Sequence, residues 1–204
     1  MDFAQSLDYL YGLQRFGIKL GLDNIRELLN RLGHPERGYG VIHVAGSNGK
    51  GSVCAGLASI LLAAGYRVGL YTSPHLHSFT ERIQVSGRFI SEEQVVQYTE
   101  ELRRLSADVP ATFFEFTTAM ALLHFDCEGV DFAILEVGLG GRLDATNAVT
   151  APLLSVITPV CLDHTAHLGA ELGLIAAEKG GIIKPGVPLV LGRQEPEALA
   201  VLLE

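Results

Sequence analysis

The sequence lacks the features that mark secreted, membrane-spanning and nucleic-acid-binding proteins. Its first residues contain no basic segment followed by an apolar core, so no signal peptide is expected. The longest apolar-rich stretch, Val53 to Ala64, is interrupted by Gly56 and is too short to cross a bilayer. Basic residues are few, because 15 Lys and Arg stand against 23 Asp and Glu, for a formal charge of −8. That balance argues against a general nucleic-acid binder, which needs a basic surface.

Cysteine is also scarce. Cys54, Cys127 and Cys161 are an odd number, lie far apart in the sequence and form no C-x-x-C motif. We therefore expect three reduced cysteines that pack as small hydrophobic side chains, and a cytoplasmic location. No internal repeat, low-complexity segment or linker is visible. With 204 residues, 48% of them hydrophobic, the chain has the size and composition of one globular α/β domain.

The strongest local signal is a glycine-rich turn between a predicted strand and a predicted helix. The turn Gly46–Ser52 (GSNGKGS) follows the apolar segment Val41–Ala45 and precedes the helical pattern of residues 53–64. Glycines let backbone N–H groups approach an anion, a helix start adds positive partial charge, and Lys50 adds a full charge. The spacing differs from the common G-x-x-x-x-G-K-[ST] loop, since two residues separate the first glycines and another glycine follows the lysine. A plain turn is the alternative, but both flanks favour binding of nucleotide phosphates.

Along the rest of the chain, apolar strands alternate with amphipathic helices. Helices are predicted at residues 3–11, 25–32, 91–106, 112–127, 170–179 and from about 196, and strands at 41–45, 66–71, 131–137, 152–158 and 187–191. Residues 80–85 and 88–90 predict a β-hairpin. Ser91 with Gln94, and Thr112 with Glu115, predict capping boxes at two helix starts. The pattern predicts an α/β fold with a doubly wound, mostly parallel sheet and a small β-hairpin insertion.

Polar residues follow several of the predicted strands. Lys50 and Ser52 come after the first, Ser73 after the next, Glu136 ends an otherwise apolar strand, and His164 lies just past another. In open parallel sheets, ligands bind outside the carboxyl ends of the strands. A hydroxyl, a carboxylate and an imidazole that meet beside a phosphate loop can hold a divalent cation that bridges nucleotide phosphates.

Each of these candidates also has a structural interpretation. Ser73 before Pro74 can start a turn, Glu136 can pair inside the core, and a lone histidine such as His164 is more often structural than a ligand. Lys179 at a predicted helix C-terminus is explained by the helix dipole. The remaining candidates are explained in the same way: His75, His77 and His167 as polar loop residues, Thr112 and Glu115 as caps, and Phe113, Phe114 and Phe116 as core side chains. Reasoning from residues alone thus reaches a magnesium-nucleotide enzyme or switch, without a substrate.

An ordered series of motifs extends this interpretation. They are Ala45–Ser52, Thr72–His75, Thr80–Arg82, Phe113–Phe116, Glu136–Asn147, Leu162–His164 and Glu178–Lys179. In this order they resemble the dihydrofolate synthase/folylpolyglutamate synthase enzymes of the Mur ligase superfamily. The resemblance covers essentially the whole chain. The long loop of residues 136–147 and the Ser-Pro-His turn are specific to the folate branch, whereas the phosphate loop indicates only the superfamily.

The resemblance implies ATP-dependent amide formation. ATP would phosphorylate the carboxylate of dihydropteroate or a folate, and the amine of L-glutamate would displace phosphate from the acyl phosphate. The implied ATP-phosphate ligands are Ser47, Asn48, Gly49, Lys50, Gly51 and Ser52, and the implied Mg²⁺ ligands are Ser73, Glu136 and His164. The implied pterin-binding residues are Thr112, Phe113, Phe114, Glu115, Leu143, Asp144 and Ala145, with Phe114 as a stacking ring and residues 14–18 nearby. Lys50, His164 and Lys179 would be catalytic, and Lys179 matches a lysine that is carbamylated in the family, which replaces its helix-dipole interpretation.

Family members are substantially longer than 204 residues, and their C-terminal domain supplies part of the adenine site and the glutamate site. We therefore expect residues 1–204 to form the ATP-binding domain without the C-terminal glutamate-ligase domain. We also expect a monomer that binds small molecules and neither nucleic acid nor membrane. Two alternatives stay open: another Mur-type amino-acid ligase, against which Arg142–Ala145 and Thr112–Glu115 argue, and a Mg-ATP-binding module that is inactive alone. Whether one or both folate reactions are catalysed also stays open.

Overall fold

A single sheet organises the protein in the computed structural model, which describes residues 1–17, 21–162 and 171–204. The strands of the sheet are β1 (Gly40–Ala45), β2 (Val68–Tyr71), β3 (Ile83–Val85), β4 (Arg88–Phe89), β5 (Phe132–Glu136), β6 (Leu154–Ile157) and β7 (Leu189–Leu191). The α-helices are α1 (Phe3–Gly12), α2 (Asp23–Arg31), α3 (Lys50–Ala63), α4 (Glu92–Leu105), α5 (Phe113–Cys127), α7 (Leu172–Gly180) and α8 (Pro196–Leu203). Short 3₁₀ helices are η1 (Leu13–Phe16), η2 (Pro35–Arg37), η3 (Phe79–Arg82) and η4 (Ala145–Ala148).

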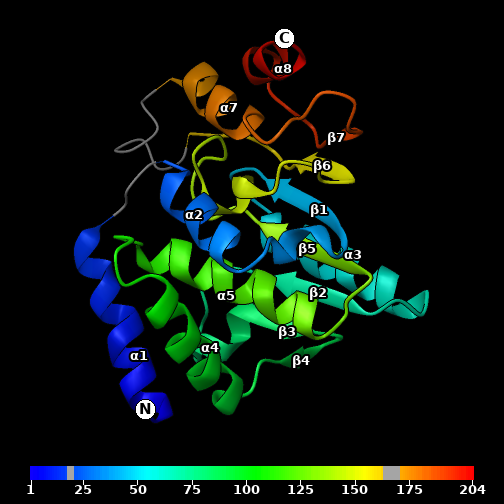
Figure 1. The fold of residues 1–204 in the computed structure, drawn as a ribbon. Helices are drawn as coiled ribbons and strands as arrows, with labels where there is room; N and C mark the ends of the chain where they lie inside the picture. Colours follow the sequence, from blue (N-terminus) through cyan, green and yellow to red (C-terminus); the bar gives the residue numbers. More distant parts are fainter. Residues whose placement is uncertain (18–20, 163–170) are drawn as a thin grey trace.

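The strand order is β4-β3-β2-β5-β1-β6-β7, with β1 in the interior of the sheet (Figure 1). Strands β2, β5, β1, β6 and β7 pair in parallel, whereas β3 and β4 pair antiparallel. In this register Val44 lies opposite Glu136, and Tyr71 lies opposite Leu135. The carboxyl ends of β1, β2 and β5 therefore meet at one edge, and the predicted α/β fold with a mostly parallel sheet is confirmed.

The predicted β-hairpin forms, and it extends the main sheet because β3 pairs antiparallel with β2. It differs from the prediction in one respect. Its first residues are not strand, because Phe79–Arg82 form the helix η3. The reason is local: Ser78 and Glu81 make a capping box that starts a helical turn there. This turn carries Arg82 to the edge of the sheet.

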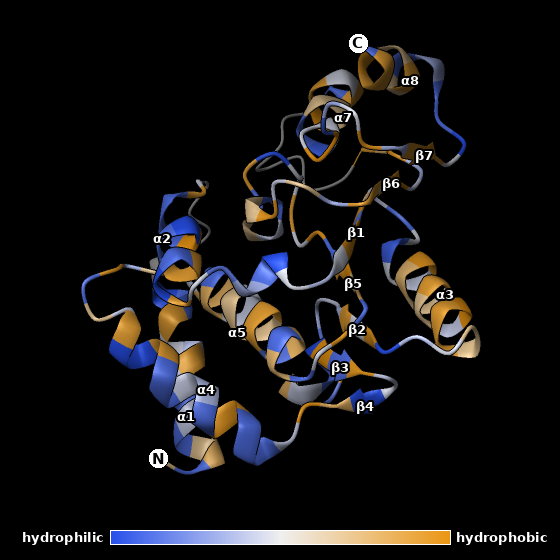
Figure 2. Cartoon of the chain, turned by 45° about the vertical axis from the view of Figure 1, so that its right-hand side comes forward, coloured by the Kyte–Doolittle hydropathy of each residue, from blue (hydrophilic) through white to orange (hydrophobic). Residues whose placement is uncertain are grey.

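Helices cover the two faces of the sheet unequally, as Figure 2 shows for α3 on one side and α5 with its neighbours on the other. Alternate residues of a strand face opposite sides, so Val41 packs against α5, whereas Ile42 and Val44 pack against α3. Helix α5 is buried on nearly all sides, because it lies between the sheet and the helices α1, α2 and α4. Helix α3 is also mostly apolar, yet its Ile60 is 66% exposed.

Most predicted elements lie within a few residues of their observed positions. Helix α3 begins at Lys50, inside the glycine-rich turn, and not after it. Both predicted capping boxes are present, at Ser91 for α4 and at Thr112 for α5. Residue 170, the predicted start of helix 170–179, lies outside the described residues. The helix is observed as α7, from Leu172. Within the described ranges, no helix is long and apolar enough to span a membrane.

The three cysteines are free, as predicted, but only one of them is packed as expected. Cys54 is buried in the layer between α3 and the sheet. Cys127 is exposed at the end of α5, so the expectation of a packed hydrophobic side chain is wrong there. Cys161 is partly buried because its backbone and sulfur contact the glycine-rich turn.

Candidate active site

The glycine-rich turn lies between the end of β1 and the first turn of α3. Gly46 has a φ of +140°, and a Cβ there would come within 1.8 Å of Thr158 Oγ1, so this position requires glycine. The backbone N–H groups of Ser47 and Asn48 both donate to the carbonyl of Pro159, at 3.1 and 3.4 Å. The residues after β6 therefore hold the first half of the turn in place.

The second half of the turn has the geometry of an anion-binding helix start. Gly49, at φ +85°, is the N-cap of α3, and no side chain caps this end of the helix. The first-turn amides of Lys50, Gly51 and Ser52 therefore face outward from an uncapped helix start, where a phosphate is favoured. Of the residues predicted to bind phosphate, Ser47 and Asn48 donate their backbone N–H groups to Pro159 within the protein.

Two lysines converge on the same carbonyl oxygen. Lys50 Nζ donates to the carbonyls of Gly46 and Ser47, at 3.0 and 3.3 Å. Lys179 Nζ, from the last turn of α7, also donates to the carbonyl of Gly46, at 3.0 Å. Lys179 is only 2% exposed, so it is not a surface lysine that merely complements a helix dipole. The structure thus brings Lys179 to the phosphate loop, although it lies 129 positions after Lys50 in the sequence.

Glu136 and Ser73 lie next to this loop. Glu136, at the end of β5, is 6% exposed, and its Oε2 accepts a hydrogen bond from the backbone N–H of Ser73 at 3.1 Å. A Cβ on Gly51 would lie 3.7 Å from Glu136 Oε1, so the carboxylate reaches the first turn of α3. Burial raises the pKa of Glu136, although the Ser73 amide and the Lys50 charge oppose this shift.

This pair fits a magnesium ion. A buried carboxylate whose pKa is raised by burial is stabilised by a nearby cation, and Ser73, whose amide bonds this carboxylate, carries a hydroxyl that would be a second hard oxygen ligand. The third predicted ligand, His164, lies outside the described residues, as do Asp163 and His167. Within the described ranges, no cluster of three or more His, Cys, Asp or Glu residues could hold a metal.

A cavity of about 440 Å³ opens beside Ser73 and Glu115. Its lining residues are Gln14, Gly17, Gly21, Ser73, Pro74, Arg82, Thr112, Phe113, Phe114, Glu115, Gly138, Leu139, Leu143, Asp144 and Ala145. All seven residues predicted to bind the pterin acid are in this set, and so is the phosphate-loop neighbour Ser73. The structure also places Gln14 and Gly17 of the predicted 14–18 loop at the cavity, while Ile18 lies outside the described residues.

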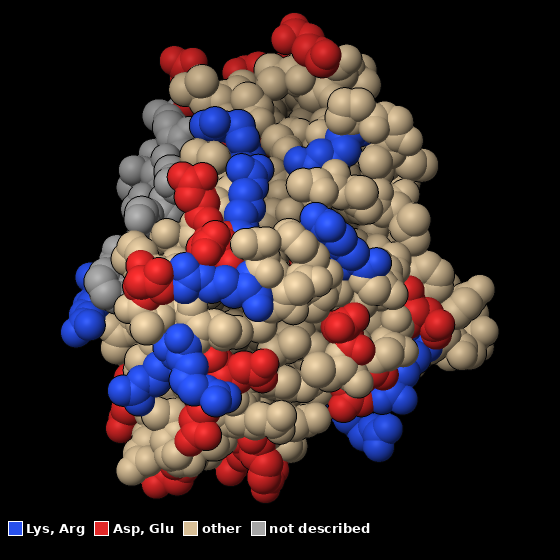
Figure 3. Space-filling view, in the orientation of Figure 1, with Lys and Arg blue, Asp and Glu red and all other residues tan. Residues whose placement is uncertain are grey.

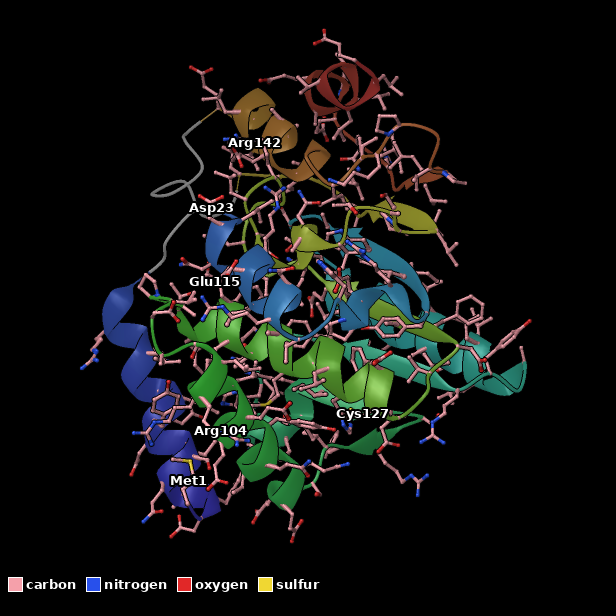
Figure 4. All side chains as sticks on the ribbon, in the orientation of Figure 1. Met1, Asp23, Arg104, Glu115, Cys127 and Arg142 are labelled. Atoms are coloured by element: carbon pink, nitrogen blue, oxygen red, sulfur yellow. The ribbon has the colours of Figure 1, made fainter. Side chains whose placement is uncertain are left out.

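One end of the cavity is shaped by the start of α5. Thr112 and Glu115 form the predicted capping box, and Glu115 Oε2 accepts from the Thr112 amide and hydroxyl at 2.8 and 2.9 Å. The same oxygen accepts from Asn24 Nδ2 of α2 at 3.3 Å, so Glu115 joins the two helices. Figure 4 labels Glu115, and above it Asp23, the first residue of α2. Capping therefore explains only part of the role of Glu115, because the capped turn is also the cavity wall. Phe114 follows on that wall and lies against Gly138, where a Cβ would meet its ring at 2.5 Å.

A second wall is the long loop after β5. Asp144 Oδ2 accepts from the backbone N–H groups of Gly138 and Leu139, at 3.0 and 2.8 Å. Its Oδ1 accepts from the amide and hydroxyl of Thr146. Burial raises the pKa of Asp144, and these four donors oppose the shift. Thr146 in turn meets Nε2 of the fully buried His43 at 2.8 Å, which ties the loop to β1.

Arg82 is the feature of the cavity to which residue-level reasoning gave no role. Its Nε donates to His75 Nδ1 at 2.7 Å, and its guanidinium carbon lies 5.3 Å from the centre of the Phe113 ring. His75, interpreted from sequence as a polar loop residue, therefore has a specific partner. The available signal was the Thr80–Arg82 motif, in which an arginine stands in a short segment next to the Ser-Pro-His turn.

Electrostatic character differs between the site and the outer surface. On the face shown in Figure 3, basic and acidic side chains are interspersed, as suits a chain with more acidic than basic residues. Around the phosphate loop, by contrast, two lysines meet at one carbonyl oxygen.

The chain was compared with protein-family models, with individual proteins and with solved structures. No protein-family model matches the chain. The chain is 45% identical over 208 residues to the dihydrofolate synthase/folylpolyglutamate synthase of Bacillus subtilis, covering 98% of this chain and 48% of that protein. The solved Escherichia coli FolC structure in complex with DHPP and ADP matches with a TM-score of 0.92 and 41% identity, over 100% of this chain and 48% of that one. The Mycobacterium tuberculosis folylpolyglutamate synthase complexed with ADP and AMPPCP matches with a TM-score of 0.87 and 40% identity. The match covers 99% of this chain and 48% of that one. The chain thus spans about half the length of the relatives that it matches.

Proposed function

Because this chain belongs to the dihydrofolate synthase/folylpolyglutamate synthase family, we propose that it is the Mg-ATP-binding and acid-binding half of a ligase that adds L-glutamate to dihydropteroate, to folates, or to both. The observation that carries this proposal is the continuity of the site. Ser73 contributes to the cavity wall and, through its amide, contacts Glu136 beside the phosphate loop. An acid held in the cavity would therefore lie next to bound nucleotide.

The roles of the residues follow from their positions. The amides at the start of α3 and the Lys50 charge bind and orient the phosphates of ATP. Ser73 and Glu136, with His164 as predicted from the sequence, would hold Mg²⁺, which neutralises phosphate charge when bound. Thr112–Glu115 and Leu143–Ala145 form the walls that hold a planar pterin acid, with Phe114 available for stacking.

The reaction that fits this arrangement has two steps. A carboxylate oxygen of the acid attacks the γ-phosphorus of ATP, the bond between that phosphorus and the bridging oxygen breaks, and ADP leaves. The amine of glutamate then attacks the acyl carbon, and inorganic phosphate leaves with the electrons of the C–O bond. We place Lys179 near the first step, because its Nζ reaches the phosphate loop; carbamylation would convert this cation into a carboxylate-like group.

The alternatives predict different ligands and products. Another Mur-type ligase would bind a UDP-sugar acid in the cavity better than a pteroate. A nucleotide-binding module would bind Mg-ATP and release no product. For residues 1–204 alone we expect this second behaviour, since half of the length of the relatives is not represented in this chain. We also propose a cytoplasmic location, supported by three free cysteines, and a monomeric state.

The test uses two forms of the protein. The 204-residue chain is titrated with Mg-AMPPCP, dihydropteroate and a UDP-sugar acid, and we expect binding of the first two. A chimaera that joins this chain to the second half of the Bacillus subtilis relative is assayed for glutamate-dependent ADP formation with dihydropteroate and with tetrahydrofolate. Absence of pteroate binding together with an inactive, folded chimaera would contradict the proposal, and product from the short chain would refute the need for a second half.

A further inference from the structure

Among the residues that the structure describes, Arg82 is a buried cation with no carboxylate partner. The residue is 8% exposed and lines the cavity. Its observed partners are the ring nitrogen of His75 and the face of Phe113, and no ion pair with Asp or Glu is found within the described ranges. Taking an arginine out of water costs free energy that a neutral nitrogen and an aromatic ring offset only in part.

The other charged residues of the cavity are already satisfied. Glu115 accepts from Thr112 and Asn24, and Asp144 accepts from backbone amides and Thr146. These carboxylates hold the walls together, whereas Arg82 is the basic side chain among the described lining residues. The cavity thus offers an incoming ligand one full positive charge.

The contacts of Arg82 fix the direction of its guanidinium. Arginine has no acceptor, so His75 Nδ1 must accept from Nε–H and the imidazole proton must lie on Nε2. Nε donates to His75, and the guanidinium lies over the Phe113 ring. The two terminal NH₂ groups therefore remain to donate a pair of hydrogen bonds to a carboxylate.

Arg82 also lies at the phosphate side of the cavity. Its carbonyl accepts from the backbone N–H of Thr72 at 3.0 Å, and the next residue, Ser73, donates to Glu136. Aromatic rings of Phe113 and Phe114 form the neighbouring wall. A ligand with a flat ring against that wall and an anionic group on Arg82 would point its acid toward the phosphate loop.

We propose that Arg82 binds the carboxylate of the acid substrate and that His75 is the positioning residue for Arg82. This inference rests on the proposed function in taking the cavity as the acid site. It adds the group that recognises the reacting carboxylate and holds it beside the nucleotide. The guanidinium also reduces the repulsion between two anions, the carboxylate and the γ-phosphate.

The test compares carboxylates with their neutral amides in binding to the 204-residue chain. The probes are dihydropteroate, its carboxamide, 4-aminobenzoate and 4-aminobenzamide. We expect the wild-type chain to bind each carboxylate about 10- to 100-fold more tightly than its amide, the range of one charge-assisted hydrogen-bonded pair. Arg82→Gln should bind acid and amide alike, and Arg82→Lys should keep part of the preference because the charge remains. Arg88→Gln, an exposed arginine on β4, is the matched control and should keep the full preference.

The outcomes separate the two proposals. A wild-type preference that persists in folded Arg82→Gln overturns the role of Arg82, and so does a wild-type chain that binds acid and amide equally. The second comparison needs no variant, so it holds even where Arg82→Gln fails to fold. A chain that binds no pteroate but prefers 4-aminobenzoate through Arg82 supports this inference while refuting the proposed substrates. Binding of none of the four probes overturns both.

Discussion

The phosphate loop and the cavity wall use hydrogen bonds in opposite ways. In the loop, Lys50 donates to the main-chain carbonyls of Gly46 and Ser47, which are neutral acceptors for its full positive charge. In the wall, Glu115 and Asp144 are surrounded by donors from three segments of the chain, so their charges are used within the protein. The charge of Lys50 is therefore available to a ligand, whereas the charges of Glu115 and Asp144 stabilise the cavity wall.

This difference implies different consequences of substitution. Replacement of Lys50 should alter binding and leave the fold intact, because this lysine is only partly buried. A change in the wall should alter stability first, because buried donors lose their acceptors. Arg82 is the exception in the wall, since it combines a fixed position with a charge that the described residues do not neutralise.

The largest effect is expected where the loop itself requires glycine. Gly46→Ala should lower the free energy of unfolding by about 3 to 5 kcal/mol, the sum of backbone strain and a clash with Thr158. Urea denaturation measures the loss. Gly138→Ala in the wall is the matched change and should cost only about 1 to 2 kcal/mol, since its Cβ meets the movable Phe114 ring. Equal losses for the two variants would contradict the comparison.

The next effect tests the wall. Asp144→Asn should cost about 2 to 3 kcal/mol of stability, because the new NH₂ group must face one of two pairs of donors. Glu115→Gln is the control and should cost less than about 1 kcal/mol, because the donors from Asn24 and Thr112 all approach Oε2 and a rotated amide oxygen can replace it. Thermal unfolding of both variants provides the measurement. A neutral Asp144→Asn would show that the loop tolerates lost acceptors.

A third change tests the loop as a binding element. Lys50→Ala should weaken binding of Mg-AMPPCP by about 10- to 100-fold, the range of charge-assisted hydrogen bonds to phosphate, while leaving the unfolding midpoint nearly unchanged. Titration calorimetry measures the affinity. Lys184→Ala is the control, because Lys184 also donates to a backbone carbonyl but lies outside the phosphate loop. Unchanged affinity in Lys50→Ala would count against the phosphate assignment.

The smallest effect concerns the turn that carries Arg82. The backbone N–H groups of Leu76, Ser78 and His77 lower the pKa of Glu81 from 4.5 to about 2. A carboxyl whose folded pKa is depressed stabilises the fold above its unfolded pKa and loses this contribution as pH falls toward 2. The stability difference between wild type and Glu81→Gln should therefore be constant above pH 5 and shrink between pH 4.5 and 2. Unfolding curves over that range measure it, and a constant difference would contradict the assignment.

The elements of the fold were largely predictable because their signals are local. Capping residues Ser91 and Thr112 marked helix starts, and the apolar run before Glu136 marked a buried parallel strand. The hairpin was predicted one turn too long, since the capping box of Ser78 and Glu81 overrides the strand pattern there. Packing of Cys127 was mispredicted because composition says nothing about which side of a helix end faces solvent.

The sequence by itself determined the phosphate loop, because glycines, a lysine and a helix start are adjacent and their geometry follows from the backbone. It also indicated Glu136, whose charge is out of place in an apolar strand. Only the tertiary structure decided that Lys179 reaches Gly46 and that Arg82 lines a cavity. It also decided that the backbone N–H groups of Ser47 and Asn48 donate to Pro159. The physical reason is that these contacts join residues far apart in the chain, and their distances depend on how strands pair and helices pack.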